Sequence, residues 1–324
     1  MKPTFGIFGF YRWIMAVMVV IGHLGPNYLW LLAPAAVKGF FVLSGYIVSY
    51  ILDTRYLHLA HGIPRYCLNR ALRVYPAYWA VTIMSAITAL ALPHLSAQRA
   101  ITLPPPPDWT TNLLILGGSS YQLVQVAWSL RIEMMWWLLI PLIILKWSET
   151  IIALLLIGSC FTATMYFSVW GGALPFILGT LLYHRKRIAL PDMPQALGMA
   201  FIGLHLVALG ICIYARYSPS DLVLWFAFIS LLHVPIIYYL SGIDSRRVRP
   251  LIKRLDAFLG ELAYPIFLVH MLASVFARLF IPGLTTNSWE AFAAGFVIAS
   301  VLAMIIVCVV ENPVCRLRQR IEYA

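Results

Sequence analysis

Residues 11–23 of the chain read YRWIMAVMVVIGH, an apolar run with an arginine near its start and a histidine at its end. The surrounding segment 8–31 is long enough to cross a bilayer as a helix, which needs about 20 mainly apolar residues. An ionisable group inside such a span costs about 2.5–3.5 kcal/mol even on the mildest scale, so it marks a functional position. We therefore predict a membrane helix in which Arg12 and His23 belong to a functional site.

The spacing of these two residues places them on one side of the helix. At about 100° per residue, His23 comes back to within about 20° of Arg12 around the axis. At the same time the two lie about 16 Å apart along the axis, roughly half of the hydrocarbon thickness. One group can therefore sit near a membrane surface while the other sits deep.

Composition extends this interpretation to the whole chain. Of its 324 residues 62% are hydrophobic and 11% are charged, whereas a soluble domain has about 25% charged residues. We expect an all-α, polytopic transmembrane helix bundle that forms one domain, 1–324. The net charge of +11 is better explained by basic cytoplasmic loops than by nucleic-acid binding. The five cysteines show no metal-type spacing, so we expect no metal site.

Hydrophobic segments predict about ten spans. The expected segments are 8–31, 35–54, 74–93, 127–146, 150–168, 171–184, 196–216, 221–241, 258–280 and 290–311. With both termini in the cytoplasm, the outer loops carry only Lys38, Arg99, Arg216 and Arg278, and most other Lys and Arg residues lie inside. This bias follows the positive-inside rule and sets the orientation.

The same topology brings His23 and Glu133 to one depth. Glu133 closes the sequence WSLRIE at 128–133, and both residues are expected roughly 9–12 Å below the outer surface. A carboxylate beside an imidazole orients the ring and raises its basicity, as a general base for a hydroxyl nucleophile requires. The alternative is a structural polar contact between two helices.

A second cluster lies at the inner end of the third span. Arg70 and Arg73 are i,i+3 neighbours on a helix, and such a pair can hold phosphate oxygens with two guanidinium groups. The alternative is ordinary positive-inside charge that contacts lipid headgroups.

Six short motifs, in order along nearly the whole chain, resemble those of the acyltransferase-3 family of integral membrane acyltransferases. They are the arginine and histidine of residues 12–23, GFFVLSGY at 39–46, RALRVYP at 70–76, WSLRIE at 128–133, LGELAYPIFLVH at 259–270 and ENP at 311–313. Arg131 stands where the family more often has a small residue, so it could contact the substrate. Met134 stands where a second acid is frequent, which suggests that one carboxylate is enough.

The resemblance implies a fold, an activity and a site. Members of this family move an acyl group, usually acetyl, from cytoplasmic acyl-CoA to a hydroxyl of a carbohydrate or similar acceptor at the other membrane face. Arg12, Arg70 and Arg73 would hold coenzyme A, and His23 with Glu133 would be catalytic. Weaker substrate candidates are Ser44, Tyr46, Tyr75 and Arg131. For Ser44, Tyr46 and Tyr75 the favoured alternative is a role in the core. His270 is a weaker site candidate, for which a structural role is the favoured alternative.

The resemblance also suggests partners and a location. We expect acetyl-CoA or another acyl-CoA as donor, a carbohydrate or lipid-linked glycan as acceptor, membrane lipids around the bundle, and the bacterial inner (plasma) membrane as the site of action. Many relatives carry an additional esterase-like domain; this chain would act without one, alone or with other polysaccharide-assembly proteins. The competing interpretations are a secondary transporter or flippase for a glycan or lipid-linked sugar, which would use the same intramembrane charges for proton coupling, and a non-catalytic scaffold.

Overall fold

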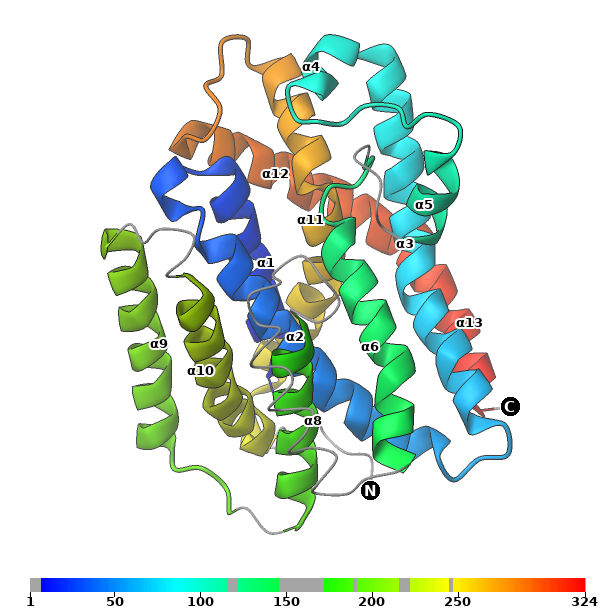
Figure 1. The fold of residues 1–324 in the computed structure, drawn as a ribbon, viewed down its shortest axis with the longest axis vertical. Helices are drawn as coiled ribbons and strands as arrows, with labels where there is room; N and C mark the ends of the chain where they lie inside the picture. Colours follow the sequence, from blue (N-terminus) through cyan, green and yellow to red (C-terminus); the bar gives the residue numbers. More distant parts are fainter. Residues whose placement is uncertain are drawn as a thin grey trace. The chain divides into compact units, whose positions relative to one another are not determined.

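The fold is known from a computed structural model that describes residues 7–115, 122–145, 172–188, 191–215, 222–244 and 247–323. Every regular element in these ranges is a helix, as a membrane requires, because only a helix or a closed barrel satisfies its backbone polar groups within lipid. Figure 1 shows the helices in their order along the chain.

The first half of the chain forms α1 Phe8–Leu24, a 3₁₀ turn Asn27–Leu29, α2 Leu32–Ile51, a π-helical turn Leu52–Tyr56, α3 Gly62–Ala91, α4 Pro93–Ala97, α5 Asp108–Leu114 and α6 Ala127–Leu145. The second half forms α8 Ala173–Ile188, α9 Gln195–Ala215, α10 Leu222–Gly242, α11 Pro250–Phe280, α12 Trp289–Ile306, a π-helical turn Val307–Glu311 and α13 Asn312–Tyr323. The predicted all-helical class is confirmed.

Among the residues that the structure describes, five helical stretches are long and apolar enough to cross a membrane by length and composition. They are Asn27–Tyr56, Gly62–Ala91, Gln195–Ala215, Pro250–Phe280 and Trp289–Arg320, and shorter apolar helices occupy Phe8–Leu24 and Ala227–Gly242. The predicted span 150–168 lies outside the described residues. The ten-span count, the orientation of the termini and the single domain 1–324 stay predictions.

The chain groups into two compact units made of alternating segments. The first unit contains Met1–Met15, Leu31–Ile63 and Ile132–Gly260, and the second contains Ala16–Trp30, Pro64–Arg131 and Glu261–Ala324.

In the first unit, α2 packs against α8 and α10, and α10 packs against α9. Two glycines bring α2 and α8 into close contact. A Cβ atom added to Gly45 would lie 2.2 Å from the carbonyl oxygen of Phe176, and one added to Gly179 would lie 2.0 Å from that of Val42. Small residues of this kind let membrane helices approach through their backbones.

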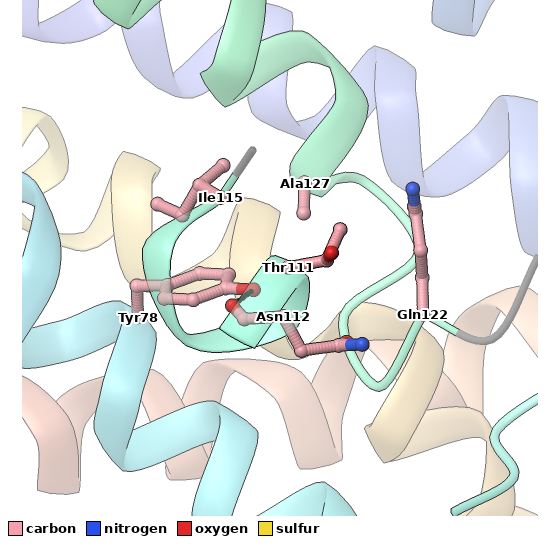
Figure 2. A pocket seen from close by; sticks show the side chains of 6 residues that line it. All are labelled: Tyr78, Thr111, Asn112, Ile115, Gln122 and Ala127. Carbon is pink, nitrogen blue, oxygen red and sulfur yellow. Dashed lines mark hydrogen bonds between the residues drawn. The ribbon is translucent and has the colours of Figure 1, made fainter. Parts of the chain in front are cut away.

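In the second unit, the loop after α4 is fixed to a buried apolar cluster formed by Ala89, Ile101, Leu123 and Val275. Nearby, a pocket opens at the start of α6 (Figure 2). Its lining residues are Tyr78, Thr111, Asn112, Ile115, Gln122 and Ala127. The Tyr78 hydroxyl donates to the Asn112 carbonyl at 2.5 Å, and the Leu123 amide donates to the Asn112 side chain at 3.0 Å. None of the six lining residues is a carboxylic acid, a histidine or a cation.

Candidate active site

His23 is positioned by the end of α1. The helix stops at Leu24 because Gly25 closes the last turn onto the Ile21 carbonyl, at 2.8 Å, and Pro26 cannot continue it. The imidazole is half-buried in the second unit. Arg12 lies earlier on the same helix, as predicted, and belongs to the first unit.

The partner of His23 within the second unit is a histidine. Its Nδ1 lies 2.9 Å from Nε2 of His270, which α11 supplies, and the two rings are nearly parallel, with 8° between their planes and 5.1 Å between centroids. His270 is completely buried. Its own Nδ1 lies 2.8 Å from the carbonyl oxygen of Phe267.

These contacts fix the tautomers of both rings when they are neutral. A carbonyl oxygen only accepts hydrogen bonds, so Nδ1 of His270 carries the proton and its Nε2 is an acceptor. His23 must then donate its Nδ1 proton to that acceptor. This leaves the lone pair on Nε2 of His23, the nitrogen that a general base uses in a histidine held at its other nitrogen.

Glu133 has a contact of its own in the first unit. The Ser44 hydroxyl of α2 donates to its Oε1 atom at 2.7 Å. Two residues that the sequence offers as site candidates therefore touch. His23 belongs to the other unit, so the pairing of Glu133 with His23 stays a prediction.

Two other predicted residues of the first unit lie in tight surroundings. The Nε atom of Arg12 donates to the Phe8 carbonyl at 3.4 Å, and a Cβ atom on Gly260 would lie 2.9 Å from its Nη2 atom. Tyr46 is buried and meets the rings of Phe8 and Tyr183 edge-on, at 5.9 and 6.0 Å between centroids. These ring contacts are typical of a core tyrosine.

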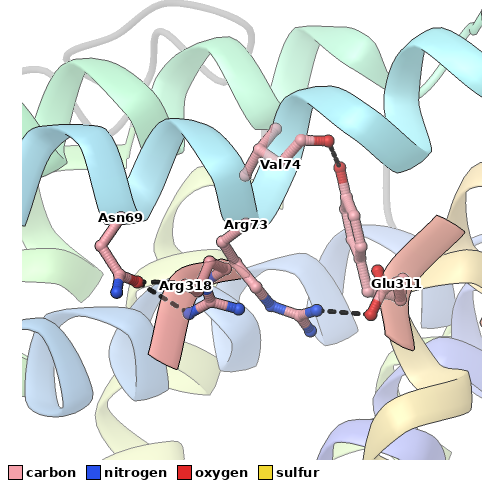
Figure 3. A network of polar contacts seen from close by, with 6 residues as sticks. Asn69, Arg73, Val74, Glu311 and Arg318 are labelled. Carbon is pink, nitrogen blue, oxygen red and sulfur yellow. Dashed lines mark hydrogen bonds and ion pairs between the residues drawn. The ribbon is translucent and has the colours of Figure 1, made fainter. Parts of the chain in front are cut away.

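One of the two predicted arginines, Arg73, lies in a polar network of the second unit (Figure 3). Arg73 forms an ion pair with Glu311 at 2.6 Å and lies over the ring of Tyr264, with 5.3 Å from its guanidinium carbon to the centroid. The Tyr264 hydroxyl donates to the Val74 carbonyl at 3.0 Å. Arg70 lies over the ring of Tyr66 at 5.7 Å. Both arginines are on one helix, α3, as predicted.

The same network contains a cation that the sequence analysis did not select. Arg318 of α13 donates through Nε and Nη2 to the side-chain oxygen of Asn69, at 3.1 and 2.8 Å. Figure 3 shows its guanidinium beside that of Arg73.

The remaining substrate candidates lie in the second unit. The Tyr75 hydroxyl donates to the Leu114 carbonyl at 3.0 Å, and its ring lies 5.2 Å from that of Trp79. Arg131 is half-buried near the start of α6.

The six short motifs meet in pairs or threes. His23 of the first motif contacts His270 of the fifth. Ser44 of the second motif contacts Glu133 of the fourth. Arg73 of the third motif contacts Tyr264 of the fifth and Glu311 of the sixth. Their residues are far apart in the chain, so the fold brings the members of each pair or trio together. His270 and Glu311 are the functional candidates that sequence reasoning undervalued, and their signal was membership of these motifs.

Comparison with known proteins gives one match that covers almost the whole chain. The family model of the acyltransferase-3 type, described as an acyltransferase domain, matches residues 9–310. Neither the curated proteins nor the solved structures contain a significant match.

Proposed function

Because this chain belongs to the acyltransferase-3 family, we propose that it is a membrane O-acyltransferase that moves an acyl group, most simply acetyl, from cytoplasmic acyl-CoA to a hydroxyl of a carbohydrate or lipid-linked glycan at the outer face. The family makes it a membrane acyltransferase. The donor, the acceptor, the bacterial inner membrane and the residue roles below are proposals.

The His23–His270 contact is the observation that supports this chemistry best. His23 is the general base: its Nε2 takes the proton of the acceptor hydroxyl while the hydroxyl oxygen attacks the thioester carbonyl. The tetrahedral intermediate then expels the coenzyme A thiolate, which takes up a proton, and the acyl ester of the acceptor is left. His270 is a positioning residue because it accepts the Nδ1 proton of His23 and so keeps the lone pair at Nε2.

Glu133 has the second role in the proposal. Ser44 fixes the rotamer of its carboxylate, which stabilises the imidazolium formed when His23 takes the proton. Arg12, Arg70 and Arg73 bind the phosphates of coenzyme A, with Glu311 holding the guanidinium of Arg73 in place.

The decisive experiment measures acetyl transfer from labelled acetyl-CoA by the purified protein in nanodiscs. Loss of a general base typically lowers the rate by about 10²–10⁴-fold, so His23→Ala should show almost no transfer while it still binds acetyl-CoA. Glu133→Gln keeps the shape of the side chain and should lose less. The double variant should be little worse than His23→Ala, because residues that act as a unit are not additive.

Two controls make the result interpretable. His205→Gln removes another buried histidine, from α9 in the first unit, and should transfer acetyl normally. Mass spectrometry of surface glycans from cells with and without the protein identifies the acceptor. Substantial transfer by His23→Ala would refute the assignment of the base.

A further inference from the structure

The second unit holds a buried cation near the histidine pair that the proposed chemistry does not use. Arg99, in the loop between α4 and α5, is 9% exposed. Its guanidinium lies within electrostatic range of the imidazoles of both His23 and His270. A buried charge is costly unless a counter-ion or several hydrogen bonds compensate it.

The partners of Arg99 are few and weak. Its Nη1 atom lies 3.5 Å from the side-chain oxygen of Asn287, at the outer limit of a hydrogen bond. Its buried Nε atom has no hydrogen-bond partner among the residues that the structure describes. Burial lowers the pKa of the Arg99 guanidinium to about 10, and the neighbouring charge of Arg278 acts in the same direction.

Arg278 makes the surroundings more positive. It is half-buried near the end of α11, and its Nη1 donates to the side-chain oxygen of Gln98, the residue before Arg99. Within the described part of the chain, neither guanidinium forms an ion pair with a carboxylate. Two like charges held together without an acid are suited to an anion that comes from outside the protein.

The backbone that carries Arg99 is well fixed, so a flexible surface position does not explain its placement. The amides of Arg99 and Ile101 both donate to the Ser96 carbonyl at 3.0 Å, and the Gln125 side chain donates to the Arg99 carbonyl. Ile101 is 1% exposed and belongs to the apolar cluster against which Met271, next to His270, also packs. The guanidinium is thus presented near the histidine pair by a rigid support.

We propose that Arg99, assisted by Arg278, forms an anion-binding subsite that recognises a negatively charged group of the acceptor. The ligand chemistry is a carboxylate or a phosphate monoester or diester on the sugar that carries the reacting hydroxyl. This inference rests on the proposed function and deepens it, because it makes the acceptor an acidic glycan or a glycan phosphate instead of a neutral sugar. An arginine fork suits both anions, since it donates parallel hydrogen bonds to two oxygens.

The binding test needs no catalysis. Purified protein in nanodiscs is titrated with glucuronate, glucose 1-phosphate and neutral glucose, and the thermal midpoint is recorded. We expect at least one of the two anions to bind more tightly than glucose by about 10- to 100-fold, the range of a charge-assisted hydrogen bond. Loss of that preference in Arg99→Gln, with partial retention in Arg99→Lys, which keeps the charge but loses the fork, identifies Arg99 as the cause. Arg316→Gln is the matched control, because Arg316 is an exposed arginine of α13.

The two anions distinguish the source of the charge: a preference for glucuronate indicates an acidic sugar, and one for glucose 1-phosphate indicates a sugar phosphate. Equal affinity for all three ligands in the wild-type protein would overturn the proposal.

If acetyl transfer is measurable, Arg99→Gln should raise KM for an acidic acceptor and leave KM for acetyl-CoA unchanged. A rise in KM for acetyl-CoA alone would assign Arg99 to the donor site. A fall in kcat with neutral and acidic acceptors alike would assign it to stabilisation of the transition state. Either result overturns the proposed acceptor subsite. Failure of acetyl transfer with every acceptor would count against the enzyme activity and leave the binding result standing.

Discussion

At the level of single residues, the proposed chemistry depends on which ring nitrogen of His23 and of His270 carries a proton. The Phe267 carbonyl determines this for His270, and His270 determines it for His23. Two successive hydrogen bonds, which begin at the backbone carbonyl of Phe267, therefore leave the lone pair on Nε2 of His23. A side-chain substitution cannot remove that carbonyl. The serine protease triad uses a carboxylate for the same purpose.

This arrangement predicts that position 270 needs an acceptor and not a histidine as such. His270→Ala should lower kcat by about 10- to 10³-fold, less than removal of the base itself, because the ring of His23 then turns and changes tautomer. His270→Gln can offer its amide oxygen to Nδ1 of His23 and should recover much of the loss. The measurement is kcat for acetyl transfer with both variants shown to be folded. Equal loss in the two would contradict the acceptor role.

Sequence reasoning identified His23 but not its partner in the second unit. The arginine–histidine spacing and the cost of burying an ionisable group pointed to His23 directly. His270 also lies in a predicted span, but no arginine precedes it at that spacing, and a histidine in an apolar helix is usually a satisfied core residue. Its distance of 247 residues from His23 hides the contact from any local pattern. Glu133 was selected on depth, and its contact with Ser44 needed the packing of α2 and α6, which periodicity does not specify.

Among the helices, α2 and α8 show how closely two backbones can pack. Ala in place of Gly45 or Gly179 would have to push the helices apart, and overpacking of this kind costs about 1–3 kcal/mol. Both variants should therefore unfold at lower temperature in a detergent thermal scan. Gly203→Ala and Gly210→Ala are matched controls on α9, where an added Cβ meets nothing within 4 Å, and they should be neutral or stabilising by up to about 1 kcal/mol. A thermal midpoint for Gly45→Ala as high as that of Gly203→Ala would contradict this account.

The contact between α3 and the π-helical turn after α12 gives a second test. The side chains of Arg73 and Glu311 are 24% and 13% exposed, so each charge depends on the other. Arg73→Ala and Glu311→Ala should each destabilise the protein by about 1.5–3 kcal/mol, and the double variant by less than their sum. Donor binding by Arg73 further predicts a larger rise in KM for acetyl-CoA in Arg73→Ala than in Glu311→Ala. Equal KM values would reduce Arg73 to a structural ion pair.

Helix positions could be predicted more closely than helix ends. The segments 127–146, 196–216 and 221–241 agree with α6, α9 and α10 to within one residue. The first predicted span was too long, because α1 ends at Leu24 whereas the apolar residues of the sequence continue beyond the turn at Gly25 and Pro26. The third was too short, because α3 begins at Gly62 and its first turns are too charged to register as hydrophobic. Hydropathy reports the lipid-facing part of a helix, whereas backbone hydrogen bonding determines its length.

For the molecule as a whole, the placement of basic residues predicts how the chain crosses the membrane. Reporter domains fused after Ala324 and within residues 99–108 should report opposite sides, because the positive-inside bias puts both termini in the cytoplasm. A fusion after Arg247, in a predicted inner loop, should agree with the fusion after Ala324. The same readout from positions 99–108 and 324 would exclude an odd number of spans between the loop and the end of the chain, and with it the ten-span arrangement.

The long interval between His23 and His270 has a consequence for biosynthesis. Membrane helices leave the ribosome in sequence order, so α1 is inserted long before α11 is translated. Until residue 270 has emerged, no acceptor holds the Nδ1 proton of His23, and its basic nitrogen is undefined. If His23 is the general base, as proposed, the nascent chain is catalytically silent for most of its synthesis, and the proposed acyl-CoA donor meets no activated base before residue 270 has emerged.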